Sequence, residues 1–477
     1  MARQNLDPTK ELFGGVIHSS GKGFYVGTEL FSILSGRLHM ANTDGLEKSN
    51  QKLEYVKQSS WIAQILATSE TSAIKEQAED ASKNELLGTS QVLAESYKDL
   101  LEVLPELFEG TETQRLRMSD QIGDLMRSLL VPRPFEVDRR TSGSLKWQTY
   151  LFSPVVPELI SDETIVKQGG LELSRNQYRG GGALAYQMLC KGKDENENQR
   201  YQATNSGLSS LVTPRQDGLF QLFLKMRELS LSKLSRTGVA DSVPKEVLTL
   251  NSFSTIIDTK SARDFRAATL AILSLPESVT NFRKIKYLLY LSGFFVARHV
   301  LECSQDKIVE QSMSRVSVLS FSRNSQIETL SRETRSRHSR VIDNAAKLVN
   351  GDVPNKEPSS FYNKTSQNLG YVDLRGRYMN YTLKLPLLEA MIFAACSREE
   401  LESGISIDEF DELLWRKYQF VTGPSSAKLA EVETGFETFI PPSIFQENLQ
   451  ALSRNLEQLG FLNSYSDATQ ILRGGLQ

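Results

Sequence analysis

The sequence predicts a mainly α-helical protein of several domains, with a helical N-terminal region (1–190) and a helical central region (219–350). The chain has 477 residues, enough for about two to four domains. Apolar residues recur at helical spacing over long stretches of both regions. Two polar stretches, 191–218 and 351–385, lack this spacing and are expected to be linkers.

The N-terminal region is expected to begin with strands and to continue as helices. Glycine-rich segments at 13–17 and 23–27 favour strands. Apolar residues at helical intervals then predict helices near 53–65, 93–104 and 116–129. The polar residues 1–10 lack the apolar stretch of a secretory signal.

Two glycine-rich runs in this region are candidate anion sites. The run from Gly14 to Gly23 has the wrong spacing for a phosphate-binding loop, and Lys22 is not followed by the Ser or Thr that binds magnesium. The run from Arg179 to Tyr186 is expected to enter a helix as a hinge or a tight packing turn. An anion cradle of backbone N–H groups is the alternative there.

The central region is predicted to contain three helices, a short strand and an arginine-rich helix, near 219–235, 262–275, 281–303, 316–321 and 324–349. The most apolar run, 287–297, is shorter than the roughly 20 residues that a membrane span needs. We therefore expect a buried helix at this position and no membrane partner.

Basic residues are concentrated in the segment 283–347. It holds twelve Lys and Arg against six Asp and Glu, a net charge of +6. Cationic side chains with interleaved Ser and Thr are typical of phosphate contacts. The candidate nucleic-acid-binding residues are Arg315, Arg323, Arg332, Arg335, Arg337 and Arg340. The alternative, a solvated helix whose arginines pair with acids elsewhere in the chain, stays open.

The C-terminal segment 386–477 has its own order of elements. Apolar spacing predicts a first helix that Gly404 ends, a short strand at Ile405, and a second helix with a capping box of Ser406 and Glu409. A loop at 421–440 and a third helix capped by Ser443 follow. Gly460 is expected to end this helix, and a hairpin formed by 461–465 and 469–472 closes the chain. This order resembles the winged-helix superfamily.

The charge of this module argues against a DNA reader. Residues 386–477 hold six Lys and Arg against fourteen Asp and Glu, a net charge of −8. Phosphate contacts dominate affinity for nucleic acid, so an acidic surface opposes binding. Protein docking is therefore favoured over DNA reading. The candidate partner-binding residues on the exposed face of the third helix are Gln446, Glu447, Gln450 and Arg454.

We predict no catalytic residue, metal site or cofactor. Cys190, Cys303 and Cys396 lie far apart in a chain with only four histidines, so free thiols of a cytoplasmic protein are expected. Glu409 and Glu412 share a helix face, but no third ligand is evident and a solvated face is favoured. The motifs of serine hydrolases, zinc proteases and paired Cys-x-x-Cys sites are missing from the sequence.

The chain as a whole resembles accessory subunits of multi-gene anti-phage restriction systems (DptG-like). The resemblance implies a bacterial protein that works within a DNA-handling or defence complex, with protein partners and double-stranded DNA. We expect a non-enzymatic subunit that docks its partners through the acidic C-terminal module and contacts nucleic acid through the basic segment. Two alternatives remain: a stand-alone DNA-binding regulator, and an enzyme with a dispersed site.

Overall fold

The computed structural model describes the C-terminal half of the chain almost continuously, and the N-terminal half in separate segments. The described residues are 8–15, 17, 23–34, 53–56, 111–114, 163–167, 170–175, 181–190, 204, 207–208, 210–211, 247–250, 259–308, 315–375, 377–437, 439–464 and 470–474. Within these residues the protein is mainly helical, as predicted from its apolar spacing.

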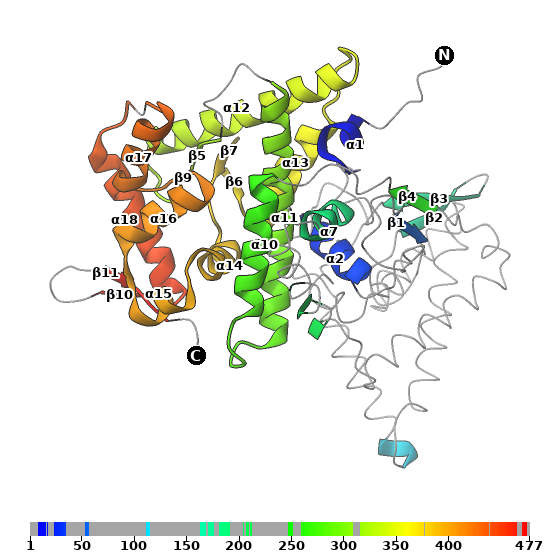
Figure 1. The fold of residues 1–477 in the computed structure, drawn as a ribbon, viewed down its shortest axis with the longest axis horizontal. Coiled ribbons are helices and arrows are strands. Elements are labelled where there is room, and N and C mark those ends of the chain that lie inside the picture. The colour runs from blue at the N-terminus through cyan, green and yellow to red at the C-terminus, as the bar shows by residue number, and fades with distance from the viewer. Residues whose placement is uncertain are drawn as a thin grey trace.

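Helices form most of the structure in Figure 1. They are α1 (Pro8–Phe13), α2 (Gly23–Leu34), α7 (Gly182–Cys190), α10 (Lys260–Leu273), α11 (Asn281–Lys307), α12 (Ser325–Val349), α13 (Glu357–Leu369), α14 (Leu385–Ala395), α15 (Arg398–Ser403), α16 (Ile407–Tyr418), α17 (Pro424–Thr434) and α18 (Pro442–Gln458).

The strands are short and belong to small sheets. They are β1 (Leu53–Val56), β2 (Glu163–Lys167), β3 (Gly170–Arg175), β4 (Val247–Leu250), β5 (Ser317–Val318), β6 (Val372–Arg375), β7 (Tyr378–Tyr381), β8 (Ile405–Ser406), β9 (Phe420–Val421), β10 (Leu462–Ser464) and β11 (Gln470–Leu472). β1 pairs with β4, β2 with β3, and β6 with β7, all antiparallel. β5 and β9 are parallel, and β10, β11 and β8 form a three-stranded antiparallel sheet in that order.

The centre of the molecule is α11, which runs beside α10 in the middle of Figure 1. The Thr280 hydroxyl caps its N-terminus by accepting from the N–H of Arg283. Residues 287–297 are buried, so the prediction of a buried helix there is confirmed. In the part of the chain that the structure describes, no helix is both long and apolar enough to cross a membrane.

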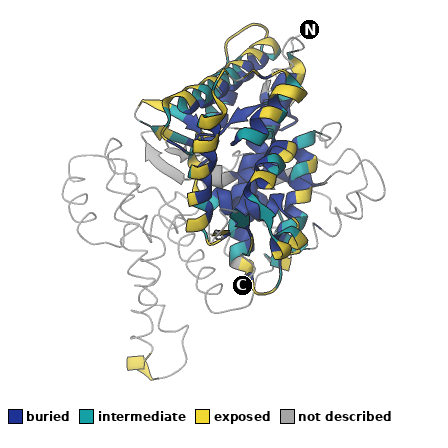
Figure 2. Ribbon diagram, turned by 90° about the vertical axis from the view of Figure 1, so that its left-hand side faces the viewer, coloured by how far each residue is buried: buried dark blue, intermediate teal, exposed yellow. Residues whose placement is uncertain are grey.

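The C-terminal elements share their core with the rest of the molecule. One cluster of buried apolar residues includes Phe13 of α1, Phe294 of α11, Leu414 of α16 and Leu472 of β11. A second cluster joins β5 and α12 to α16, α17 and α18. Figure 2 shows the buried residues as a continuous interior, with exposed residues on the outer faces of the helices. The described residues between 385 and 474 therefore share buried apolar clusters with α11 and α12.

Several predicted features of the C-terminal segment are confirmed. Ser406 and Glu409 form the capping box of α16, with distances of 3.2 Å from the Glu409 N–H to the hydroxyl and 2.8 Å from the Ser406 N–H to the carboxylate. Ile405 lies in β8, and β10 and β11 form the hairpin. Gly460 follows α18 in the left-handed region, with φ of 77°, which glycine adopts without strain.

The strand prediction for the glycine-rich start of the chain was wrong. Residues 8–13 form α1, and 23–34 form α2. Gly27 allows α2 to pack closely on α11, because a Cβ at this position would lie 2.6 Å from Cδ2 of Leu289. Residues 53–56, expected to be helical, are strand β1. The predicted helices near 93–104, 116–129 and 219–235 lie outside the described residues.

Three segments predicted as linkers or loops contain regular structure. The stretch 351–385, predicted as a linker, holds α13 and the β6–β7 hairpin. Pro358 lies in the first turn of α13, where the missing N–H of proline would have no partner within the helix. The stretch 421–440 holds α17. In the polar stretch 191–218, the described residues 204, 207–208 and 210–211 are helical.

Two helix boundaries were also placed wrongly. The N-cap of α18 is Pro441 rather than Ser443, because Pro442 already lies in the first turn. The first helix of the C-terminal segment ends at Ala395, and Gly404 instead ends the separate helix α15.

Candidate functional site

The arginine-rich helix α12 lies along one edge of the molecule (Figure 1). Its N-terminus is capped by Asn324, whose side-chain oxygen accepts a hydrogen bond of 3.0 Å from the N–H of Gln326. One face is buried and includes Ile327, Ser331, His338 and Ile342. Four of the six candidate arginines lie on α12, and Arg315 and Arg323 precede it, so the six are distinguished by their contacts.

Three of the six candidate nucleic-acid residues are held by internal contacts. Arg335 donates to the carbonyl of Met379 at 3.1 Å and to the side chain of Asn363 at 2.8 Å, which ties α12 to β7 and α13. The guanidinium of Arg332 lies 4.1 Å from the centre of the Tyr378 ring. Arg315 forms an ion pair of 2.8 Å with Asp306. These contacts fit the structural interpretation of the basic segment.

The other three, Arg323, Arg337 and Arg340, are the accessible cations of the set. Arg323 and Arg340 are exposed, and Arg337 is partly exposed. Arg337 and Arg340 lie three residues apart on α12 and are therefore neighbours on its surface. Within the described part of the chain, the structure shows no ion pair to any of the three.

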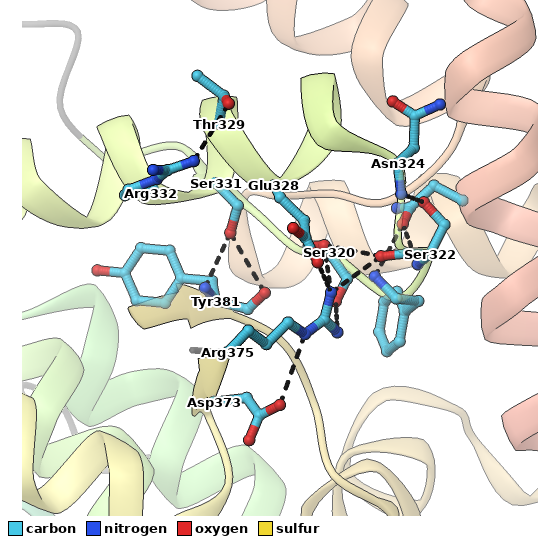
Figure 3. A network of polar contacts seen from close by, with 12 residues as sticks. Ser320, Ser322, Asn324, Glu328, Thr329, Ser331, Arg332, Asp373, Arg375 and Tyr381 are labelled. Atoms are coloured by element: carbon cyan, nitrogen blue, oxygen red, sulfur yellow. Dashed lines mark hydrogen bonds and ion pairs between the residues drawn. The ribbon is translucent and has the colours of Figure 1, made fainter. Parts of the chain in front are cut away.

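Arg375, for which the sequence predicted no role, organises the junction below α12 (Figure 3). Its guanidinium donates to the Ser322 carbonyl at 2.9 Å, to the Ser320 carbonyl at 2.9 Å and to the carboxylate of Glu328 at 2.7 Å. Asp373, two residues earlier in β6, lies 3.5 Å from its Nε. Arg375 therefore fixes the β6–β7 hairpin to Glu328 in the first turn of α12 and to the segment before it.

A second structural residue missed from the sequence is Asn448 of α18. Its side chain is buried and makes four hydrogen bonds. The amide oxygen accepts from the N–H groups of Phe321 at 2.8 Å and Ser322 at 3.0 Å. The amide nitrogen donates to the carbonyls of Leu319 and Thr422, both at 2.8 Å. All four bonds of the amide are thus made, and they join α18 to the segment that enters α12.

A signal for Asn448 was present in the sequence. It stands on the apolar stripe of the third helix, beside Leu449 and between Phe445 and Leu452. A polar residue at such a position must find partners, because an unpaired buried amide is unfavourable. The partners themselves lie 26 to 129 residues away in the chain, so spacing does not identify them.

Asp411 is a buried carboxylate that holds the start of α17. It accepts hydrogen bonds from the N–H of Ser426 at 2.9 Å and from the hydroxyl of Thr422. Burial raises the pKa of Asp411, and the bonds from Ser426 and Thr422 offset only part of this effect. The carboxylate therefore serves as a helix cap across elements, and the helix dipole favours its negative charge at that end.

The outer face of α18 is exposed, as predicted. Gln446, Glu447, Gln450 and Arg454 are all open to solvent. Glu447 also accepts a hydrogen bond of 2.9 Å from the Asn324 side chain, the residue that caps α12. Helix α18 of the acidic module thus contacts the N-terminal cap of the arginine-rich helix within the same chain.

The cysteine and histidine that lie together are poorly suited to nucleophilic chemistry. The sulfur of Cys303 is 3.5 Å from Nε2 of His299. Burial raises the pKa of the Cys303 thiol and lowers the pKa of His299, so both groups are held neutral. His299 is occupied by hydrogen bonds to Phe13 and Thr259, each 3.0 Å long. The pair is a packed core contact.

Other acidic side chains, including the candidate pair Glu409 and Glu412, also have structural roles. The carboxylate of Glu302 accepts from the N–H groups of Lys260 and Ser261 and so caps α10. Glu409 belongs to a capping box, and Glu412 pairs with Arg416 at 2.8 Å. Among the residues that the structure describes, His, Cys, Asp and Glu side chains form no group of three suited to a metal ion.

No protein-family model matches the chain, and no curated protein or solved structure is significantly similar to it.

Proposed function

We propose that this protein is a non-enzymatic adaptor subunit of a bacterial DNA-handling or anti-phage defence complex. It binds a protein partner through the exposed face of α18, and double-stranded DNA through the accessible arginines of the basic segment. It works in the reducing cytoplasm, where free thiols such as Cys303 and Cys396 persist.

We assign residues 385–474 to the winged-helix class. The support is the pairing of β11 with both β10 and β8, which joins the strand before α16 to the hairpin that follows α18. Helices α14, α16 and α18 supply the three-helix part, and α17 is an additional helix between the second and the third. The acidic charge of the module makes it a docking module rather than a DNA reader.

One observation carries the adaptor proposal: the shared packing of α18 and α12. Asn448, the Asn324–Glu447 hydrogen bond and the apolar cluster of Phe445, Val318 and Ile327 join these helices into one body. The partner-binding residues and the accessible arginines are therefore held at a fixed separation. A rigid body with an acidic and a cationic surface is suited to hold a protein and a nucleic acid together.

The DNA contact is assigned to three residues only. Arg323 and Arg340 are exposed, Arg337 is partly exposed, and the described part of the chain shows no ion pair for any of them. Arg315, Arg332 and Arg335 instead contact Asp306, Tyr378 and Asn363. Each phosphate neutralised on B-DNA contributes about 0.9 to the slope of log K against log salt. Three contacts would therefore contribute about 2.7 to this slope. Binding of this kind is electrostatic and does not read the base sequence.

The test is affinity purification of the tagged full-length chain from its native host, with and without nuclease. The wild-type protein is expected to bring down a partner that nuclease does not release. The triple variant Gln446→Ala, Gln450→Ala, Arg454→Ala should lose this partner. Glu447 is left unchanged because it also accepts from Asn324.

A second triple variant, Arg323→Ala, Arg337→Ala, Arg340→Ala, tests the proposed DNA contact in a binding assay with a labelled 20-base-pair duplex. It should keep the protein partner and lose salt-sensitive duplex binding. A protein that purifies alone from the host, with both triple variants behaving as wild type, would refute the adaptor role.

A further inference from the structure

A groove lies between the first half of α12 and the loop before α18. It has a volume of about 690 Å³. The α12 side chains that line it are Ser325, Gln326, Thr329, Leu330, Glu333 and Arg337. The loop contributes residues 435–437, Phe439 and Ile440. We propose that this groove binds an amphipathic helix of the partner protein, with lysine or arginine residues flanking its apolar stripe.

The shape of the α12 wall favours a helical occupant. Ser325, Thr329, Glu333 and Arg337 follow one another at four-residue spacing and form a ridge along the helix, and Gln326 and Leu330 form a second ridge beside it. The shallow groove between two such ridges can accept a side-chain ridge of another helix. The lined length from 325 to 337 is about 18 Å at the helical rise, which matches about three turns of a partner helix.

The groove offers side chains rather than a free strand edge. The residues that line it lie in α12 and in the loop, and none of them belongs to a strand. Extended peptides usually bind by adding a strand to an exposed sheet edge, whereas helices bind through apolar anchors at i, i+3 or i+4, and i+7. The helical mode is therefore the one that this surface supports.

An exposed aromatic ring marks the rim. Phe439 is 91% exposed, which is unusual for so large an apolar side chain. Its position is set by the end of α17, where Gly435 adopts φ of 66° and the buried Phe436 donates its N–H to Ala430. The floor beside it is apolar and includes Leu330 and Ile440, which pack against the core cluster of Phe436 and Phe445. Phe439 is the natural anchor for an apolar partner surface.

Charge determines which helix fits. Glu333 and Glu437 line the groove against the single cation Arg337, and in the described chain no ion pair is shown for either glutamate. The loop wall belongs to the C-terminal segment of net charge −8, and the α12 wall, although part of the basic segment, places one arginine and one glutamate among the lining residues. A helix with flanking lysine or arginine residues would meet Glu333 and Glu437, whereas an acidic helix would meet like charge. We therefore assign a basic occupant.

The probe for the test is a phage-displayed library of 16-residue peptides, selected against the immobilised full-length protein. Selection should enrich peptides with apolar residues at i, i+4 and i+7 and a net positive charge. A synthetic copy in which each Lys and Arg is replaced by Glu should bind at least tenfold more weakly. Enrichment of proline-rich, acidic or uncharged peptides would overturn the proposal.

The matched variants are Phe439→Asp and Val432→Asp. Val432 is 76% exposed on α17 but does not line the groove. Both substitutions replace an exposed side chain, so both proteins should fold. Phe439→Asp should weaken the selected peptide at least tenfold, and Val432→Asp should leave its affinity unchanged. Equal affinities for the two variants would refute the groove as the site.

This inference rests on the proposed function, but each can fail without the other. If the native partner is lost on alanine substitution of the α18 face and is kept by Phe439→Asp, the adaptor stands and the groove proposal falls. A concentration-dependent dimer in sedimentation velocity that Phe439→Asp abolishes would make a second copy the occupant and would also overturn it. Loss of the native partner in Phe439→Asp, with Val432→Asp unaffected, supports both.

Discussion

Replacement of Asn448 by alanine should destabilise the protein more than any exposed change on the same helix. The substitution removes four hydrogen bonds at once, to Phe321, Ser322, Leu319 and Thr422. Each buried group left without a partner costs about 1–3 kcal/mol. If water entering the vacated space satisfies half of them, the loss is about 2–6 kcal/mol. Folded proteins have only about 5–15 kcal/mol of stability, so the effect should be plain.

Urea denaturation and thermal melting of the purified variant measure this loss. A decrease of about 4 kcal/mol corresponds to a fall in Tm of roughly 8–16 °C. The control is Gln450→Ala, two residues further on the exposed face of α18, where a change within about 0.5 kcal/mol is expected. Asn448→Asp should also destabilise at pH 7 by placing a carboxylate against two carbonyls, and this loss should shrink as the pH falls. Equal stabilities for Asn448→Ala and Gln450→Ala would refute the reasoning.

Three further predictions concern charged side chains. Arg335→Ala should lower the free energy of unfolding by about 1–3 kcal/mol through its lost hydrogen bonds, whereas Arg340→Ala should stay within about 0.5 kcal/mol and weaken duplex binding instead. Equal unfolding energies for the two variants would contradict the division of the arginines. The pKa of Asp411 is higher in the folded protein than in the unfolded chain. Its contribution to the free energy of unfolding is therefore full at a pH below the unfolded pKa, and is lost as the pH rises through the folded pKa. Melting curves from pH 4 to 8 should therefore show Asp411→Asn gaining stability relative to wild type as the pH rises, and a constant difference would contradict this sign. Burial alone would raise the pKa of Glu389, but hydrogen bonds from Tyr287 and Arg283 outweigh it and lower the value. Stability from Glu389 is thus present above its unfolded pKa and lost at lower pH, and Glu389→Gln should cost about 1–3 kcal/mol at pH 7 and less near pH 3.

Elements with strong local signals could be predicted from the sequence. The amphipathic stripe of α12, the capping box at Ser406 and the glycine after α18 each follow from residues close together in the chain. Helix α17 was missed because its buried face consists of the small residues Ser426, Ala427 and Ala430, which make a weak apolar pattern. Helix α2 was missed because its glycines suggested strands, although Gly27 serves close packing on α11.

The candidate site could be predicted only in part. The sequence identified the basic helix and the exposed positions of α18, since both follow from helical periodicity. It did not separate Arg335 from Arg340, because the partners of Arg335 lie 28 and 44 residues away. The groove was also missed, since its two walls come from α12 and from the loop before α18, more than 90 residues apart in numbering. Long-range packing decides which charges remain available to a partner.

The adaptor role is tested most directly by the formation of a ternary complex. Size-exclusion chromatography with light scattering would follow the chain, its isolated native partner and a labelled duplex in one sample. The wild-type protein should hold both ligands in a single peak. The Gln446, Gln450 and Arg454 alanine variant should keep only the duplex, and the Arg323, Arg337 and Arg340 alanine variant should keep only the partner. If either folded variant loses both ligands, or neither variant loses any, the two-surface adaptor is contradicted.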